Sequence, residues 1–283
     1  MENIHIFNEE LSVEISPLGA EIQSVVDKNG VERMWQGDPN VWSGRAPVLF
    51  PFAGGLKDGY YMYGGRRYDL PQHGFARTSV FQVEEQQSSS VTFLLDEQNE
   101  NYPFVYALRV RFSLRGAALK VEFIVNNNGD TPMYYGVGAH EAYACPEGIS
   151  KCKLVFDKEE SLRTAVLEGA QITTRFEELT RNSNTLRLKP DYFRQDGTLV
   201  FMQVNSRGVT LESDARKERV RVDFDDFDYL LVWQKTRAAY VCIEPWTNPP
   251  EYTTSDHMLS HKPGMLLLAP GKQKIHAHTI TFL

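Results

Sequence analysis

Apolar and polar residues alternate with a period of two along most of this chain, and no other feature restricts the fold as strongly. A period of two places successive side chains on opposite faces of a strand, so each such run predicts a strand with one buried face. Residues 11–15 (Leu-Ser-Val-Glu-Ile) show the pattern in its simplest form. Further strands are expected at 20–26, 91–95, 106–114, 118–125, 199–204, 209–212, 220–224, 229–233, 240–243 and 274–282.

Turn signals separate these runs, and helical signals are few. Residues 27–30 (Asp-Lys-Asn-Gly) and 126–130 (Asn-Asn-Asn-Gly-Asp) are rich in residues that tight turns require. A short helical turn is expected at 38–42, and 165–179 is the only place for a brief helix. Many strands with almost no helix predict an all-β fold, a large antiparallel β-sandwich of two stacked sheets. Without a linker or internal repeat, residues 1–283 are expected to form a single domain.

Charge and cysteine usage exclude several classes of protein. The net charge of −7 and the lack of a basic stripe argue against a nucleic-acid partner. No apolar run approaches the roughly 18 residues of a membrane span, and no signal peptide is visible. Cys145, Cys152 and Cys242 are too few for a disulfide framework and are expected to be reduced thiols. These features predict a cytoplasmic protein that does not bind membranes.

Three places depart from the alternation and are candidates for a functional site. Residues 44–77 are crowded with Gly, Pro and aromatics, and a loop of this length builds a binding site or is a surface excursion with structural glycines. His140 follows small residues that allow close backbone approach, and it is either a proton-transfer group or a structural histidine. Glu244 ends an apolar strand, where burial of a carboxylate needs partners, unless the strand end lies in water.

These places belong to a series of ordered motifs that carry a resemblance. The motifs are Ser-Pro-Leu-Gly-Ala-Glu-Ile at 16–22, Arg-Ala-Pro-Val-Leu-Phe-Pro at 45–51, His-Gly-Phe-Ala-Arg at 73–77, Gly-Ala-His at 138–140, Cys-Ile-Glu-Pro-Trp at 242–246 and Leu-Ala-Pro-Gly at 268–271. With them the chain resembles the aldose 1-epimerase (galactose mutarotase-like) family over nearly its whole length, in its smaller bacterial branch. The resemblance implies the large galactose mutarotase-type β-supersandwich.

The resemblance also implies roles for single residues. His140 stands at the position of the general acid, and Glu244 at that of the general base. Arg45 and His73 stand where the family holds sugar hydroxyls or the ring oxygen, and Asp196 matches a substrate-binding aspartate. The chain departs from the family where Glu141 follows His140, because a proline is usual there.

The reaction that the resemblance implies needs only positioned proton transfer. Mutarotation opens a pyranose ring, so the anomeric hydroxyl loses a proton while the ring oxygen gains one. Glu244 would take the first and His140, as imidazolium, would give the second, a contribution of about 10²–10⁴-fold. Trp246 would offer a flat surface to the sugar ring.

No cofactor and no metal are expected for such a reaction. The sequence has neither a phosphate loop nor a dinucleotide fingerprint. His276 and His278 are two apart on the strand expected at 274–282, hence on one face, and are interpreted as a surface pair rather than a metal site.

Three alternatives stay open at this point. A non-catalytic sugar-binding protein could use the same fold, and an epimerase for hexose 6-phosphates could use Arg45, Arg66, Arg67 and Arg77. A glycoside hydrolase would pair Glu244 with Glu141 or Asp196. The expected partner is a small aldose, and the chain is expected to be a monomer or a homodimer.

Overall fold

Strands make up nearly all of the regular structure in the computed structural model, which describes residues 2–283 apart from the side chain of Asp196. The strands are β1 (Ile4–Phe7), β2 (Leu11–Ser16), β3 (Glu21–Asp27), β4 (Tyr60–Tyr63), β5 (Arg66–Asp69), β6 (Gln82–Gln87), β7 (Ser90–Leu95), β8 (Tyr106–Arg115), β9 (Ala118–Asn127), β10 (Met133–Tyr135), β11 (Glu141–Ala144), β12 (Cys152–Glu160), β13 (Arg163–Glu168), β14 (Gln171–Glu178), β15 (Ser183–Arg187), β16 (Thr198–Phe201), β17 (Gly208–Ser213), β18 (Val220–Asp223), β19 (Tyr229–Trp233), β20 (Tyr240–Trp246), β21 (Leu266–Leu268) and β22 (Gln273–Phe282). The helices are short 3-10 segments: η1 (Lys57–Gly59), η2 (Ala76–Thr78), η3 (Ile149–Lys151), η4 (Pro190–Asp196) and η5 (Leu259–His261).

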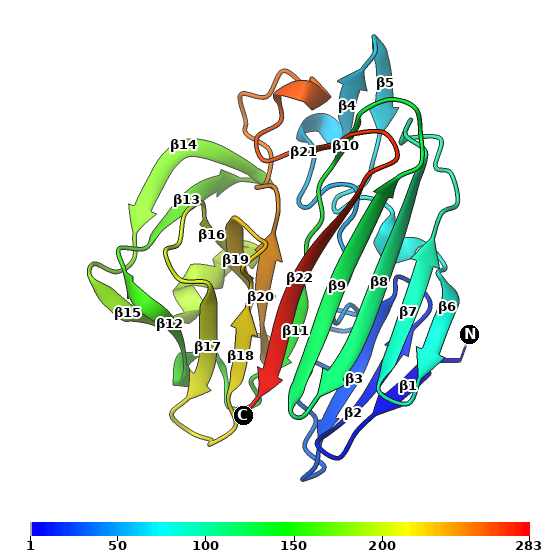
Figure 1. The fold of residues 1–283 in the computed structure, drawn as a ribbon. Coiled ribbons are helices and arrows are strands. Elements are labelled where there is room, and N and C mark those ends of the chain that lie inside the picture. The colour runs from blue at the N-terminus through cyan, green and yellow to red at the C-terminus, as the bar shows by residue number, and fades with distance from the viewer. Residues whose placement is uncertain (1) are drawn as a thin grey trace.

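One large sheet dominates the architecture. Its nine strands follow the order β15-β12-β17-β18-β22-β9-β8-β7-β6, and Figure 1 shows them running across the molecule. A four-stranded sheet (β11-β20-β19-β16), a three-stranded sheet (β1-β2-β3) and three two-stranded sheets accompany it. Every paired strand is antiparallel, which confirms the expected all-β antiparallel fold. The sheets are more numerous than the two that the sequence predicted.

The alternation in the sequence corresponds to burial in the structure. In β2, Leu11, Val13 and Ile15 are buried while the residues between them are not. Side chains like these, from Ile6 to Phe282, join in one large hydrophobic cluster between the sheets. A core that draws on both ends of the sequence supports the single-domain interpretation, which stays a prediction.

The helix expected at 165–179 is wrong, because this segment forms most of the hairpin β13–β14. Leu167 pairs with Ile172 across a turn at Gly169, whose φ of +60° a helix does not allow. The segment also carries β-branched residues, which lose side-chain freedom in helices and pack well on a pleated surface. The short turn at 38–42 is present, since the Trp42 amide donates to the Asp38 carbonyl at 2.8 Å.

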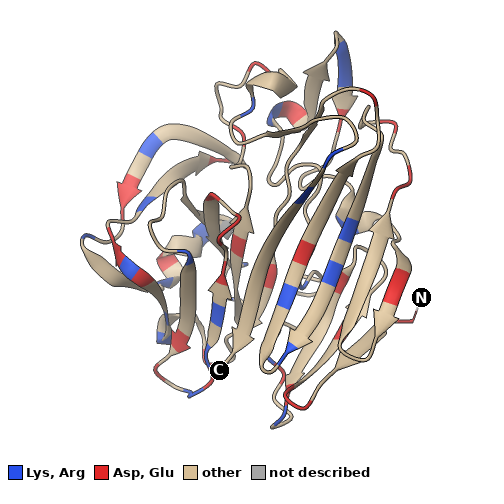
Figure 2. Cartoon of the chain, in the orientation of Figure 1, with Lys and Arg blue, Asp and Glu red and all other residues tan. Residues whose placement is uncertain are grey.

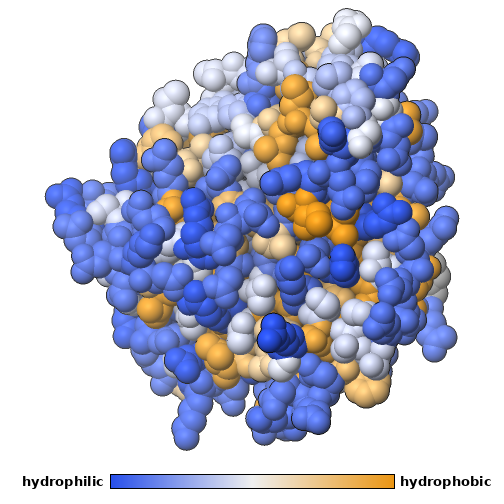
Figure 3. Space-filling model, viewed as in Figure 1, coloured by the Kyte–Doolittle hydropathy of each residue, from blue (hydrophilic) through white to orange (hydrophobic). Residues whose placement is uncertain are grey.

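The face of the nine-stranded sheet seen in Figure 2 carries interspersed positive and negative charges rather than a basic stripe. Lys120 and Arg111 both contact Glu122 there, at 2.8 and 3.4 Å. The same face is largely hydrophilic, with scattered apolar spots (Figure 3). None of the described helices is long and apolar enough to cross a membrane.

Candidate active site

A cavity of about 750 Å³ lies where the segment 44–77, the hairpin β13–β14, η4 and the strands β19 and β20 meet. Five residues that the sequence singled out line it, namely His73, Arg77, His140, Glu244 and Trp246. The glycine-rich segment therefore forms part of a cavity wall and is more than a surface excursion.

The strands explain how His140 and Glu244 meet. Glu244 lies on β20, whose seven residues are all buried, and His140 directly precedes β11, which pairs with β20. Close approach of these backbones depends on Gly138, where a Cβ would lie 2.7 Å from the Trp246 ring. Small residues before His140 are therefore a packing requirement of the site.

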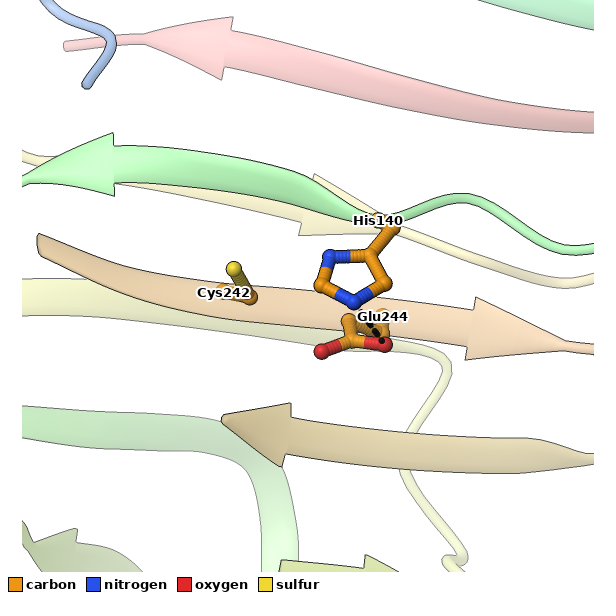
Figure 4. Close-up of side chains that lie close together, drawn as sticks. All are labelled: His140, Cys242 and Glu244. Atoms are coloured by element: carbon orange, nitrogen blue, oxygen red, sulfur yellow. Dashed lines mark ion pairs between the residues drawn. The ribbon is translucent and has the colours of Figure 1, made fainter. Parts of the chain in front are cut away.

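His140 and Glu244 are in direct contact at the cavity wall. The His140 Nε2 lies 3.4 Å from the Glu244 Oε2, and both side chains are buried (Figure 4). The other polar atoms of the pair, His140 Nδ1 and Glu244 Oε1, are buried without a hydrogen-bond partner among the described residues. Since buried polar atoms are nearly always hydrogen-bonded and both side chains line the cavity, these two atoms could bond a ligand there.

Burial sets the protonation of this pair. Desolvation raises the pKa of Glu244 well above its usual range, and the neighbouring Glu141 carboxylate adds to the effect. Desolvation likewise lowers the pKa of His140 to about 3, and the Arg77 charge adds to it. Both directions favour the uncharged forms, a protonated Glu244 and a neutral His140. Burial therefore disfavours the imidazolium form of His140 that the sequence analysis assigned to the reaction.

The lowered pKa of His140 predicts a specific loss of stability in acid. Between about pH 6.5 and 3 the unfolded chain binds a proton at His140 that the folded chain does not, so the free energy of unfolding falls as pH falls. A His140→Asn variant is expected to lose less stability over this window in urea titrations at several pH values. The exposed His5 gives a matched control, and His5→Asn should follow the wild type. Parallel curves for wild type and His140→Asn would contradict the assignment.

His73 has a defined tautomer. Its Nδ1 accepts a hydrogen bond from the Gly54 amide at 3.1 Å, so the proton must be on Nε2, which lies 3.3 Å from the side-chain amide of Gln72. Burial lowers the pKa of His73 well below its usual value, which keeps the ring neutral. His73 is thus a neutral hydrogen-bond donor at the cavity wall.

Arg45 does not line the cavity. Its guanidinium donates to the Gln23 Oε1 at 2.9 Å and to the Gln36 carbonyl at 2.7 Å, which fixes the segment before the loop. Arg77 is one of the cations that line the cavity, and its guanidinium has no hydrogen bond or ion pair with any described residue. Arg77 belongs to the same motif as His73, so that motif was the available signal for it.

The aromatic wall is larger than the sequence suggested. Trp246 lines the cavity but is almost fully buried, with its Nε1 donating to the Ala139 carbonyl at 3.1 Å. Trp42 and Trp233, which the sequence analysis missed, also line it, with ring centroids 5.4 and 5.5 Å from that of His140. Both are half-buried, so part of each ring surface is available to a ligand.

The side chain of Asp196 lies outside the described part of the structure, so its predicted contact with substrate stays a prediction.

The interpretation of His276 and His278 as a surface pair is wrong, because both are buried between the sheets. His276 Nε2 contacts the Tyr135 hydroxyl at 2.9 Å, and His278 Nε2 contacts the Glu141 Oε1 at 2.8 Å. Strand alternation gave their common face correctly, but that face points inward.

Comparisons with known proteins identify the family of the chain. The chain is 33% identical to the protein LacX of Lactococcus lactis subsp. lactis, over 99% of both chains. The solved structure of a galactose mutarotase related enzyme from Lactobacillus acidophilus superposes with a TM-score of 0.94 at 33% identity, over 100% of this chain and 97% of that one. A galactose mutarotase-like protein from Lactobacillus casei gives a TM-score of 0.93 at 27% identity, with 100% of both chains covered. A model of the family named aldose 1-epimerase matches residues 2–281. The chain therefore belongs to the aldose 1-epimerase family of sugar isomerases.

Proposed function

We propose that this protein interconverts the α and β anomers of a free hexose, with Glu244 and His140 exchanging protons with the anomeric hydroxyl and the ring oxygen. The observation that carries the proposal is the 3.4 Å contact between two buried side chains at the wall of a cavity large enough for a sugar. One of them is suited to accept a proton and the other to donate one. Each of the two side chains also keeps one buried polar atom unpartnered, ready for a substrate oxygen.

The proton count of the pair fits the reaction. The uncharged form favoured by burial, with protonated Glu244 and neutral His140, holds the same single proton as the carboxylate–imidazolium form. Moving that proton from one group to the other prepares Glu244 to take the hydroxyl proton and His140 to give one to the ring oxygen. After rotation about C1–C2 the two transfers reverse, and the pair returns to its starting state. Electrons and groups are not transferred.

The remaining wall supplies what a neutral sugar needs. The Nε2–H of His73 can donate to a sugar oxygen, because its tautomer is fixed by the Gly54 amide. Trp42 and Trp233 offer flat apolar surface to the ring face of the sugar. Binding of this kind orients the ring against Glu244 and His140.

Magnetisation-exchange NMR between the anomeric protons of several aldoses tests the proposal. Exchange faster with protein than without it, for at least one free hexose, is the expected result. If no aldose exchanges faster, the catalytic proposal fails. Tryptophan fluorescence titrated with the same sugars would then show whether the chain is a non-catalytic sugar-binding protein.

A hexose 6-phosphate is the second candidate substrate, and the observation that favours it is the guanidinium of Arg77 in the cavity, which has no partner among the described residues. Arg66 and Arg67 are exposed on β5 and do not line this cavity, whereas Arg194 and Lys235 do. Arginine binds phosphate through charge-assisted hydrogen bonds, so the cavity has a cation suited to this group.

The Arg77→Gln variant distinguishes the two substrates. If the phosphate is bound there, KM for the 6-phosphate should rise by about 10-fold or more, the effect of losing a hydrogen bond to a charged group. KM for the free hexose should change little. The exposed Arg66 provides the matched control Arg66→Gln. A similar rise for both sugars would show that Arg77 holds a hydroxyl common to them.

The geometry does not support the hydrolase alternative with Glu141, whereas the pairing of Glu244 with Asp196 stays a prediction because that side chain lies outside the described structure. Glu141 lies on the face of β11 opposite to Glu244 and contacts His278, so it cannot act with Glu244 on one glycosidic bond.

The cellular location and the oligomeric state are also proposals. Three buried cysteines without a disulfide suit a reducing cytoplasm, and a monomer or homodimer is expected.

A further inference from the structure

A third side chain with metal-binding chemistry lies beside His140 and Glu244. Cys242 is two residues before Glu244 on β20, so its side chain is on the same face of the strand. One ligand atom from each of the three residues lies within 4.8 Å of the others (Figure 4). Ligand atoms of a tetrahedral zinc ion, at about 2.0–2.3 Å from the metal, are roughly 3.5 Å apart. Small side-chain movements would therefore bring the three atoms to coordination distance.

The donor set selects a particular class of ion. A thiolate, an imidazole and a carboxylate together suit Zn²⁺ and Co²⁺, whereas Mg²⁺ prefers oxygen ligands and retains its water. Binding would release the protons of the Cys242 thiol and of Glu244 to solvent, and the two anionic ligands would neutralise the charge of a divalent ion, which lowers the cost of burying it.

The surroundings of these three side chains offer a path by which an ion can enter and polar atoms that could coordinate it. His140 and Glu244 line the cavity, so an ion can approach from solvent and keep an open position for water or a sugar oxygen. His140 Nδ1 and Glu244 Oε1 are buried and unpartnered within the described structure. Cys242 is fully buried and unpaired, and the exchange of protons with a sugar gives it no task.

We propose that His140, Cys242 and Glu244 bind a thiophilic divalent cation such as Zn²⁺, and that the bound ion stops anomer exchange by occupying both proton-transfer groups. The ion is an inhibitor in this proposal, and the reaction itself does not need it. The inhibition rests on the proposed function, whereas the binding does not.

Cobalt(II) tests the binding directly. Co²⁺ added to the apo protein is expected to give a thiolate-to-cobalt charge-transfer band in the near ultraviolet, which Zn²⁺ should abolish by displacement. The band should be lost in Cys242→Ser and in Cys242→Ala, the second of which keeps apolar packing if serine disturbs the fold. Cys152, another buried thiol, provides the control Cys152→Ser, which should keep the band. Absence of the band in the wild type, or its persistence in both Cys242 variants, overturns the proposal.

Anomer exchange tests the inhibition. Zn²⁺ should slow exchange by the wild type at least 10-fold, reversibly with EDTA, while Mg²⁺ should have no effect. The Zn²⁺ concentration for half-inhibition, relative to each variant's own metal-free rate, should rise at least about 10-fold in Cys242→Ser and Cys242→Ala. Equal sensitivity of wild type and variants contradicts inhibition through this site. A cobalt band without any anomer exchange would instead count against the proposed function alone.

Discussion

Replacing Glu244 by glutamine is expected to lower the rate of anomer exchange by about 10²–10⁴-fold, the usual contribution of a positioned acid–base group. Glutamine has nearly the same shape, so the packing of β20 is preserved, but its amide cannot accept and return a proton. Magnetisation-exchange NMR measures the effect. The exposed Glu177 on the hairpin β13–β14 gives the control Glu177→Gln, which should keep the wild-type rate. A Glu244→Gln variant with near-normal exchange would remove Glu244 from the mechanism.

The same substitution is expected to stabilise the fold at neutral pH. The unfolded chain releases the Glu244 proton at its usual pKa, whereas the folded chain keeps it to a much higher pH because the site is buried. Above about pH 4.5 the folded state therefore binds more protons, and wild-type stability falls as pH rises. Glutamine removes this dependence, so urea unfolding should show the advantage of the variant growing with pH. Loss of activity with gain of stability is the signature of a functional group held in an unfavourable environment.

Alanine at Gly74 is expected to destabilise the protein by about 3 kcal/mol or more. Gly74 has a φ of +71°, and a Cβ there would lie 2.2 Å from the carbonyl oxygen of Phe50 and 2.8 Å from the Pro51 ring. The backbone must shift to relieve this contact, and overpacking adds to the cost of the left-handed conformation. Because His73 is the preceding residue, the shift should also impair sugar binding.

A substitution at Gly59 separates the cost of the steric contact from the cost of the left-handed backbone conformation. Its φ of +76° is nearly the same, but nothing lies within 4 Å of a Cβ placed there. Gly59→Ala should therefore cost only about 1–2 kcal/mol, the price of the conformation alone. Urea unfolding of both variants measures the difference. Equal losses would mean that the contact at Gly74 relaxes without cost.

The fold class could be read from the sequence because strand alternation is local. The sequence does not predict the hairpin β13–β14 because its alternation is weak, and the turn at Gly169, across which Leu167 pairs with Ile172, decides the structure. Which strands are neighbours in the nine-stranded sheet depends on contacts distant in sequence, which a local pattern does not encode. The same limit explains His276 and His278, since alternation cannot say whether both faces of a strand are covered.

The sequence identifies the site residues that lie in recognisable motifs. It does not identify those whose side chains reach the cavity only through tertiary contacts. His73, His140 and Glu244 lie in such motifs, and the structure brings them to one cavity. The choice between Arg45 and Arg77 depends on hydrogen bonds to Gln23 and Gln36 that hold the first arginine away. Trp42 and Trp233 reach the cavity from segments whose sequences resemble any core strand or turn.

The place of β22 in the large sheet has a consequence for the order of assembly. Hairpins join β6, β7, β8 and β9 in sequence order, but β22 enters between β9 and β18, and His276 faces Phe123 across about 150 residues of chain. Contacts so distant in sequence form slowly. Through Glu141 and His278 this closing strand also touches the strand that begins next to His140. Catalytic competence should therefore be the last property regained on refolding, after most of the strands have already paired.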